Sequence, residues 1–395
     1  QKPFKFPPPD GFQPLNAANV RPETVIARPD QFVGVITYTG TGLARNIDIG
    51  TQPDLVWVKV RNHTYYHYLV DSVRGAGKEL NSNTDGVETT DTSNISAFNA
   101  NGFSLGTGAG VNQSGGKNYV AWAWKAGGAP TATNDNTSGA MDANSVSIDG
   151  VLQSAYAPSG SPTIYPKKMS VGTKQGFSIV KYVGNGSTNA KLPHGLSQAP
   201  DFLTVKCTDY NYRNWQTFHK SIGNTRAIRL DSSDAQQAAA SSWWNNTSPT
   251  SDIVTLGNSG DANQVSLNYI MYAWHNVPGL QKFGSYTGNG DADGPFIELG
   301  FRPAVLITKR TDGGSNNWQL IDAVRSPSNP SNIVLKPDES AAESSSADYA
   351  TDFLSNGFKH RTGHIARNGN GNTYIYMAWA EAPTVNLFGG SSNAR

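Results

Sequence analysis

The stretch Tyr119-Val-Ala-Trp-Ala-Trp124 decides the fold, because the chain repeats its pattern twice more. It returns as Tyr269-Ile-Met-Tyr-Ala-Trp274 and again as Tyr374-Ile-Tyr-Met-Ala-Trp379. Each copy is aromatic and apolar, and Gly or Pro follows it within a few residues, which is typical of a buried strand that closes a domain. Self-similarity of this kind predicts a repeat architecture with three domains in one chain.

Two further landmarks precede each closing strand. Tyr38, Tyr182 and Tyr286 occupy equivalent positions in an opening strand that runs into a glycine turn. A nearly continuous apolar run then begins at a proline and ends at a lysine six residues later, which predicts a central strand. These runs are 53–59, 200–206 and 303–309.

The closing strands carry apolar or small residues at every position. Alternation along a strand sends Tyr119 and Ala121 to one side and Val120 and Trp122 to the other. We therefore expect each closing strand to be buried on both faces, at the centre of its domain.

Composition agrees with an all-β fold of three tandem β-sandwiches. The 41 Gly and 22 Pro disfavour long helices, while aromatic residues at 10% supply large surfaces to bury. The predicted bounds are an extended N-terminal segment (1–31), sandwiches at 32–128, 173–279 and 280–388, a linker or small hairpin insertion at 129–172, and a tail (389–395).

Charge and cysteine content exclude several functional classes. The 31 Lys and Arg against 30 Asp and Glu leave a net charge of +1, so no strong field attracts nucleic acid or an anionic membrane. No run of about 18 apolar residues predicts a membrane span. The single Cys207 excludes an internal disulfide framework, and its apolar neighbours predict a small buried residue.

The sequence offers no catalytic residue that we would select, since it lacks a serine nucleophile elbow, a phosphate loop and a His-Glu-x-x-His motif. Asp71-x-x-Arg74 recurs as Asp322-x-x-Arg325, and repetition favours an ion pair or turn brace over an active site. His360 and His364 are interpreted as surface histidines, because a metal site needs further ligands.

One turn offers a candidate calcium site. Asp291 and Asp293 lie one residue apart, just before Gly294. Calcium prefers six to eight oxygen ligands, and the corresponding turns of the other two copies lack these acids. An Asp-rich turn without any ion is the alternative, and no other cofactor is expected.

Exposed aromatic residues give the binding hypothesis. A tryptophan beside short polar side chains can stack on a sugar ring while its neighbours bind the hydroxyl groups. Trp243 has this setting and is an addition to Trp244, which aligns with core positions of the other copies. A second candidate rim lies in the loops just before two aromatic strands expected at 67–71 and 215–219, and it consists of Tyr65, Tyr66, Tyr210 and Tyr212. Ordinary packing is the alternative for each of these tyrosines and for Trp243.

The motifs of the third copy resemble a known family. Its Tyr-Thr-Gly-Asn-Gly turn, the run 299–303, Asn316-Asn-Trp318, Asn356-Gly-Phe358 and the closing strand through Pro383 resemble a lectin-like β-sandwich repeat. That repeat occurs in structural and tail-fibre-like proteins of tailed bacteriophages, and the resemblance implies sandwiches of the jelly-roll or concanavalin-like kind. Residues 2–16 also resemble the last strand and exit of a SPRY domain, which implies an upstream domain.

The resemblance implies a non-enzymatic virion surface protein: a tail fibre, a spike or a capsid decoration, with adhesion to host glycans. Other virion proteins and further copies of the chain, as a homotrimer, are the implied partners. A secreted bacterial adhesin or carbohydrate-binding array is the alternative, and a glycan-cleaving enzyme is a third.

Overall fold

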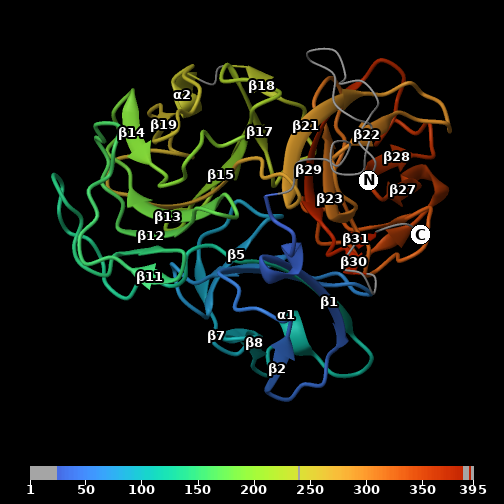
Figure 1. The fold of residues 1–395 in the computed structure, drawn as a ribbon, viewed down its shortest axis with the longest axis horizontal. Coiled ribbons are helices and arrows are strands. Elements are labelled where there is room, and N and C mark those ends of the chain that lie inside the picture. The colour runs from blue at the N-terminus through green and yellow to red at the C-terminus, as the bar shows by residue number, and fades with distance from the viewer. Residues whose placement is uncertain (1–24, 239–240, 386–390, 393–395) are drawn as a thin grey trace, which may run out of the picture.

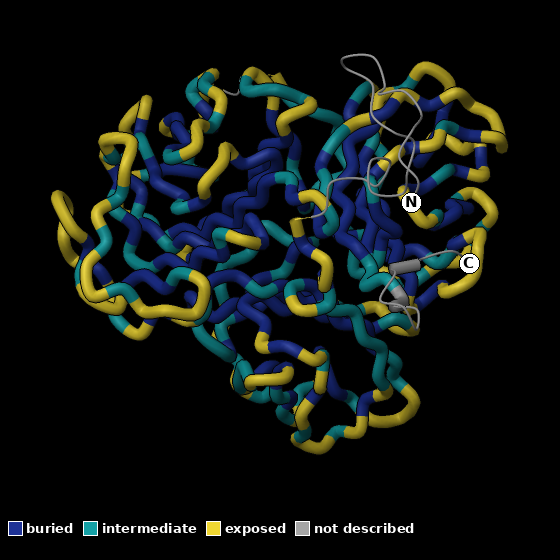
Figure 2. Tube along the Cα trace, in the orientation of Figure 1, coloured by how far each residue is buried: buried dark blue, intermediate teal, exposed yellow. Residues whose placement is uncertain are grey.

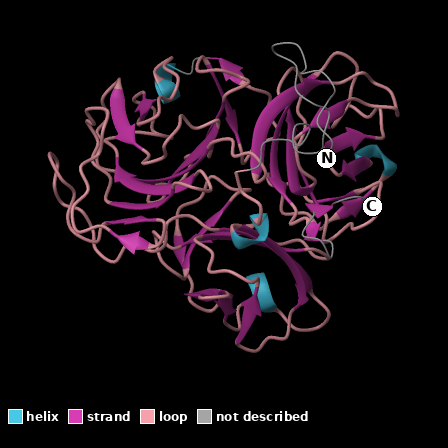
Figure 3. Ribbon diagram, viewed as in Figure 1, coloured by secondary structure: helices cyan, strands magenta, loops and turns pink. Residues whose placement is uncertain are grey.

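The computed structural model describes residues 25–238, 241–385 and 391–392. Strands dominate this part of the chain, so the all-β prediction is confirmed (Figure 3). Its helices are single turns: η1 (Pro29–Gln31), α1 (Ala109–Asn112), α2 (Ser241–Trp244) and η2 (Ala347–Tyr349). Most of the predicted N-terminal segment, the SPRY-like stretch and most of the predicted tail lie outside the described residues.

The first sandwich pairs a six-stranded sheet with a three-stranded sheet. The larger sheet has the order β1 (Val33–Thr39), β9 (Asn118–Trp124), β3 (Leu55–Val60), β4 (Tyr68–Asp71), β5 (Lys78–Asn81) and β6 (Thr89–Thr90). The smaller sheet consists of β2 (Arg45–Asp48), β8 (Gly102–Leu105) and β7 (Ile95–Asn99). Apolar side chains of both sheets form one core cluster between the layers.

The second sandwich has the same plan with a longer sheet. The order is β11 (Val151–Leu152), β10 (Val146–Ile148), β12 (Lys168–Gly172), β13 (Phe177–Val183), β20 (Asn268–Trp274), β15 (Phe202–Cys207), β16 (Gln216–His219), β17 (Arg226–Arg229) and β18 (Gln237–Ala238). The opposite layer is β14 (Ala190–Pro193) with β19 (Ile253–Leu256).

The segment predicted as a linker or hairpin insertion therefore extends this sheet. It forms the β10–β11 hairpin, and β12 joins it to β13. Val146, Met169 and Val171 are buried in the core of the second sandwich, which explains why the segment is ordered against it.

The third sandwich pairs β21 (Gln281–Thr287), β29 (Thr373–Ala380), β23 (Pro303–Arg310) and β24 (Gln319–Asp322) with a second layer of β22 (Phe296–Glu298), β28 (Gly357–His360) and β27 (Thr351–Leu354). Two small hairpins complete it, β25 (Ile333–Val334) with β26 (Ser344–Ser345) and β30 (Thr384–Val385) with β31 (Ser391–Ser392).

The closing strands lie where the sequence placed them. Each of β9, β20 and β29 pairs on both sides, with the opening strand of its own copy and with its proline-to-lysine strand. Tyr119, Tyr269 and Tyr374 point into the sandwiches, where each stacks on the opening-strand tyrosine with ring centroids 5.0–5.3 Å apart. Burial on both faces is confirmed.

The second face of each closing strand meets the other two sandwiches. Figure 1 shows three lobes around a common centre, and Figure 2 shows that this centre is buried while exposed loops lie at the rim. Trp124, Trp274 and Trp379, the last residue of each repeated motif, belong to one apolar cluster built from all three sandwiches. The Trp379 ring lies 5.3 Å from Trp124 and 6.1 Å from Trp274, centroid to centroid.

Equivalent backbone hydrogen bonds close the three sandwiches into a ring. A loop of the first sandwich binds the second, where Glu88 N donates to Thr208 O at 2.8 Å. The same loop of the second binds the third, where Gln236 N donates to Thr311 O at 3.0 Å. The third returns to the first, where Glu343 N donates to Arg61 O at 2.7 Å. The arrangement has approximate threefold symmetry within one chain.

Candidate functional site

We call the three contact zones between neighbouring sandwiches the seams, and the repeated Asp-x-x-Arg pairs lie in them. Asp71 and Arg74 form a buried ion pair at 2.5 Å, and Asp71 Oδ1 accepts from the backbone N–H of Val73 and Arg74. The hydroxyl of Tyr272, from the second sandwich, donates to Asp71 Oδ2 at 2.7 Å. The pair is the turn brace that the sequence predicts, and it also holds the neighbouring sandwich.

The same device recurs between the third and first sandwiches. Asp322 and Arg325 pair at 2.5 Å, Trp122 Nε1 donates to Asp322 Oδ2 at 3.1 Å, and the Arg325 guanidinium lies 5.5 Å from the Trp122 ring centroid. His219 stands at this position in the second sandwich and donates from Nε2 to the carbonyl of Tyr376 at 3.3 Å. The repeated Asp-x-x-Arg motif therefore serves assembly of the ring.

The repeated lysines have a related role. Lys206 Nζ donates to the carbonyl of Asp85 at 3.1 Å, and Lys309 Nζ donates to that of Ser233 at 2.7 Å, each in the preceding sandwich. Lys59 donates within its own sandwich, to the carbonyl of Val60 at 2.9 Å and to that of His63 at 3.3 Å. Burial lowers the pKa of all three lysines to about 8.

The seam between the first and third sandwiches contains the best candidate binding site. It is a cleft of about 470 Å³ between the loop that follows β3 and the loop that follows β25, which we call the seam cleft. Tyr66 is 49% exposed there, and the hydrogen bond from Tyr65 N to Ser340 O (3.1 Å) fixes the backbone beside it. The lining residues are Thr64, Tyr66, Asn83, Asp338, Glu339, Ser340 and Ala341.

Two carboxyl groups of the seam cleft are held in place by neighbours. Asp338 accepts from Trp318 N at 3.1 Å and from Asn317 Nδ2 at 3.0 Å, and Asn317 Nδ2 also donates to Glu339 at 2.7 Å. Burial raises the pKa of Asp338 to about 6. The cleft combines one exposed aromatic ring with fixed oxygen acceptors, an arrangement that suits a hydroxyl-rich ligand.

The other tyrosines of the predicted rim lie apart from this cleft. Tyr65 is partly buried in the core of the first sandwich. Tyr210 and Tyr212 are 51% and 78% exposed at the seam between the second and first sandwiches, with the Arg213 guanidinium 5.2 Å from the Tyr210 ring centroid. The loop at the third seam has Gly313 and Gly314 in this region. The structure thus distributes the tyrosines over two seams.

Trp243 is not an exposed stacking platform, so the binding hypothesis is wrong for this residue and the alternative of ordinary packing is correct. Its side chain is 9% exposed and belongs with Trp244 to the core of the second sandwich. Both residues lie in the single turn of α2, and both pack toward the core. The polar neighbours Ser241 and Ser242 occupy the exposed side of that turn.

The two acids of the candidate calcium turn are exposed and bind protein groups. Asp293 pairs with Lys359 at 2.8 Å and with Arg361 at 3.1 Å. Asp291 Oδ1 accepts from Asp293 N at 2.8 Å, as in an Asx turn. Within the described ranges, no three His, Cys, Asp or Glu residues gather in a way that could hold a metal ion.

The interpretation of His360 as a surface residue is wrong. His360 is fully buried inside the third sandwich, and burial together with the Arg367 charge lowers its pKa well below the usual value. His364 is exposed. Alternation along β28 explains the burial, because His360 lies two residues after the buried Phe358 and so points to the same side. Cys207 is buried, as predicted.

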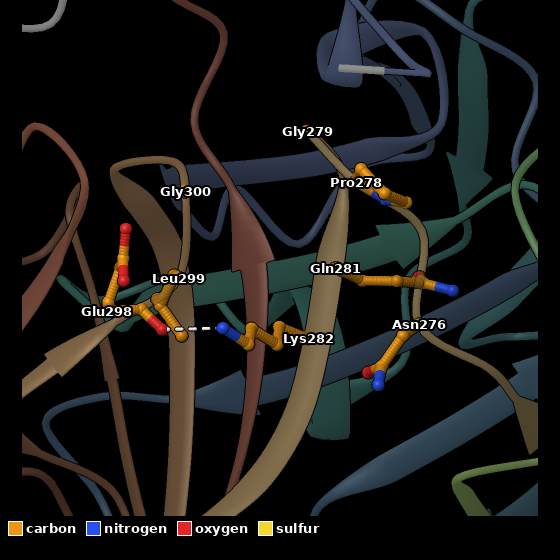
Figure 4. A pocket seen from close by; sticks show the side chains of 8 residues that line it. All are labelled: Asn276, Pro278, Gly279, Gln281, Lys282, Glu298, Leu299 and Gly300. Atoms are coloured by element: carbon orange, nitrogen blue, oxygen red, sulfur yellow. Dashed lines mark hydrogen bonds between the residues drawn. The ribbon is translucent and has the colours of Figure 1, made fainter. Parts of the chain in front are cut away.

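A second cleft, of about 300 Å³, lies where the second sandwich leads into the third (Figure 4). Its polar side chains serve the fold. Gln281 Nε2 donates to three backbone carbonyls, Asn276 Oδ1 accepts from Phe283 N, and Lys282 Nζ donates to the carbonyl of Glu298 at 2.8 Å. We therefore assign this cleft to the junction between sandwiches and not to ligand binding.

The fold and the seam cleft define a class, an all-β protein in which three sandwiches close into a ring around a shared apolar core. The chain belongs to the family described as Domain of unknown function (DUF7483), which matches residues 28–153 and 157–383. No curated protein and no solved structure matches the chain. Among the described residues, no helix is long and apolar enough to cross a membrane.

Proposed function

We propose that the chain is a non-enzymatic component of a bacteriophage virion surface, a tail fibre, spike or capsid decoration that binds host glycans through its seam loops. The observation that carries the binding proposal is the seam cleft, where Tyr66 faces fixed oxygen acceptors contributed by another sandwich. The virion assignment is supported by the motifs of the third copy, which resemble the phage lectin-like repeat.

The ring supports such a role in a second way. Because the three sandwiches share one core, the seam loops are held at fixed separations and orientations. When several loops of a rigid protein bind one surface, less conformational entropy is lost than with mobile loops. Several weak contacts can then combine into a higher overall affinity. Tyr66 and the pair Tyr210 and Tyr212 lie at two different seams, and each seam is available as a separate weak subsite.

The binding proposal is tested on a glycan array with the folded protein and two variants. Tyr66→Ala removes the ring and should weaken binding roughly tenfold, or about 1.4 kcal/mol. Tyr66→Phe keeps the ring and is the matched control, which should retain most of the affinity. Absence of binding by the folded wild-type protein, or equal affinity of all three proteins, would refute the role of the seam cleft.

The virion proposal needs a separate experiment. Antibodies against this chain, imaged on intact phage particles, should label a regular position on the tail or capsid surface. Purified particles that carry no label, from a lysate in which the chain is expressed, would contradict the assignment.

A further inference from the structure

The interior of the third sandwich is polar at positions where the other two are apolar. Three positions can be aligned through their strand pairing. Thr308 stands opposite Tyr376, as Val58 stands opposite Ala121 and Val205 opposite Met271. His360 pairs with Thr351, as Leu105 pairs with Ile95. These polar residues of the third sandwich are all buried.

Arg367 is a fourth replacement and the largest. The opening-strand tyrosine of each copy donates its hydroxyl hydrogen to the carbonyl of the residue at this position, which is Val111 in the first sandwich, Ala262 in the second and Arg367 in the third. Val111 and Ala262 belong to the apolar cores of their sandwiches. A guanidinium has therefore taken the place of a small apolar side chain inside a β-sandwich.

The guanidinium of Arg367 is enclosed without a partner. The residue has 0% exposure, and all three of its side-chain nitrogens lack a hydrogen-bond partner among the described residues. The Tyr349 ring lies 5.8 Å from the guanidinium carbon. Burial lowers the pKa of Arg367 to about 10, which leaves the group charged at neutral pH.

The neighbouring groups do not supply the missing negative charge. Among the described residues, the groups that raise the pKa of Arg367 are two tyrosine side chains, Tyr286 and Tyr349, and neither is a carboxylate. The Tyr286 hydroxyl donates its hydrogen to the Arg367 carbonyl. The Tyr286 oxygen therefore accepts the hydrogen of His360 Nε2, which lies 2.8 Å away. A buried charge without a counter-ion costs several kcal/mol, and a buried guanidinium without acceptors costs more.

We propose that the interior of the third sandwich binds one small monovalent anion, such as a halide, at the unpaired N–H groups of Arg367. A halide is small enough to accept hydrogen bonds from several N–H groups inside a closed sandwich, and it supplies the charge that a water molecule lacks. The first two sandwiches have Val111 and Ala262 here and therefore have no such site. The anion is a structural part of the third sandwich.

The test uses the dependence of stability on chloride at constant ionic strength, with gluconate as the balancing anion because it is too large to be enclosed. A ligand that binds only the folded state raises the unfolding midpoint as its concentration exceeds its dissociation constant. The wild-type midpoint should rise with chloride concentration, and that of Arg367→Val, which introduces the residue of the first sandwich, should not. Arg226→Val removes an exposed arginine and should keep the response.

A second measurement covers the case in which Arg367→Val fails to fold. Crystals of the wild-type protein soaked in bromide should show an anomalous peak within hydrogen-bonding distance of the Arg367 nitrogens. Equal chloride responses of wild type and Arg367→Val, no response of the wild type, or no bromide peak at Arg367 would each overturn the proposal.

Discussion

The centre of the ring and the loops at its seams differ in how far the three copies agree. At the centre the copies are nearly interchangeable, with Trp124, Trp274 and Trp379 meeting in one cluster. In the loop after the proline-to-lysine strand they diverge, with two adjacent tyrosines in the first copy, Tyr210 and Tyr212 in the second and glycines in the third. The comparison teaches that the shared positions hold the ring together, whereas the proposed binding function depends on positions that are not shared.

Removal of a central tryptophan should have the largest effect. Trp379→Ala would enlarge an apolar cavity that already measures about 30 Å³ at the centre, and truncation of a buried aromatic costs about 3–5 kcal/mol. Chemical denaturation should show this loss in the unfolding of the whole ring. Phe296→Ala, at a 45% exposed position of the same sandwich, is the control and should change stability by less than about 0.5 kcal/mol.

Breaking the ion pair at a seam should come next. Asp322→Ala leaves the buried Arg325 with its weaker contact to Glu343 at 3.4 Å and removes the acceptor of Trp122 Nε1, at a cost of about 3 kcal/mol. The double variant Asp322→Ala, Arg325→Met should recover much of this loss in denaturant unfolding, since no buried charge remains. A double variant as unstable as the single one would show that the pair is not the cause.

Protonation of Asp338 should have a smaller effect. Burial raises the pKa of Asp338 in the folded state from 3.8 to about 6, so the folded state binds its proton more tightly than the unfolded state. The resulting stabilisation is complete below about pH 4 and is lost as the pH rises through 6. Asp338→Asn introduces the residue that the first copy has there, Asn83. Relative to wild type, this variant should gain on the order of 2 kcal/mol between pH 4 and pH 7, measured by denaturant unfolding. A pH-independent difference would contradict the assignment, and the exposed Asp348→Asn is the control for a lost charge.

The seam tyrosines should matter least for stability. Tyr66→Ala and Tyr212→Ala remove side chains that are 49% and 78% exposed, so each should change the free energy of unfolding by less than about 0.5 kcal/mol. Thermal unfolding checks this directly. A loss comparable to that of Trp379→Ala would remove the contrast between centre and seam.

Much of the fold could be predicted because it depends on local patterns. The repeated closing strand, its alternation and its glycine turns suffice for an all-β chain with buried central strands. The closed ring could not be predicted. A strand that is apolar on both faces must be covered on both, but its sequence does not show which part of the chain covers each face. Trp122 illustrates this, since its indole donates to Asp322, 200 residues away in sequence.

The candidate site was predicted only in part for a related reason. Tyr66 is exposed as the rim hypothesis requires, but the acids that face it come from another copy, and sequence neighbours give no sign of that contact. The exposure of Trp243 could not be predicted from its polar sequence neighbours, because neighbours in a helical turn can point to solvent while Trp243 points to the core. Arg367 carries a readable signal, an arginine aligned with Val111 and Ala262, which becomes visible when the copies are aligned at the asparagine that directly follows each of these residues.

Differential scanning calorimetry tests the central claim most directly. Three sandwiches that share one core and close through equivalent seams should unfold together, in a single transition whose calorimetric and van't Hoff enthalpies agree. Separate transitions for the sandwiches, or a van't Hoff enthalpy near one third of the calorimetric value, would contradict the account.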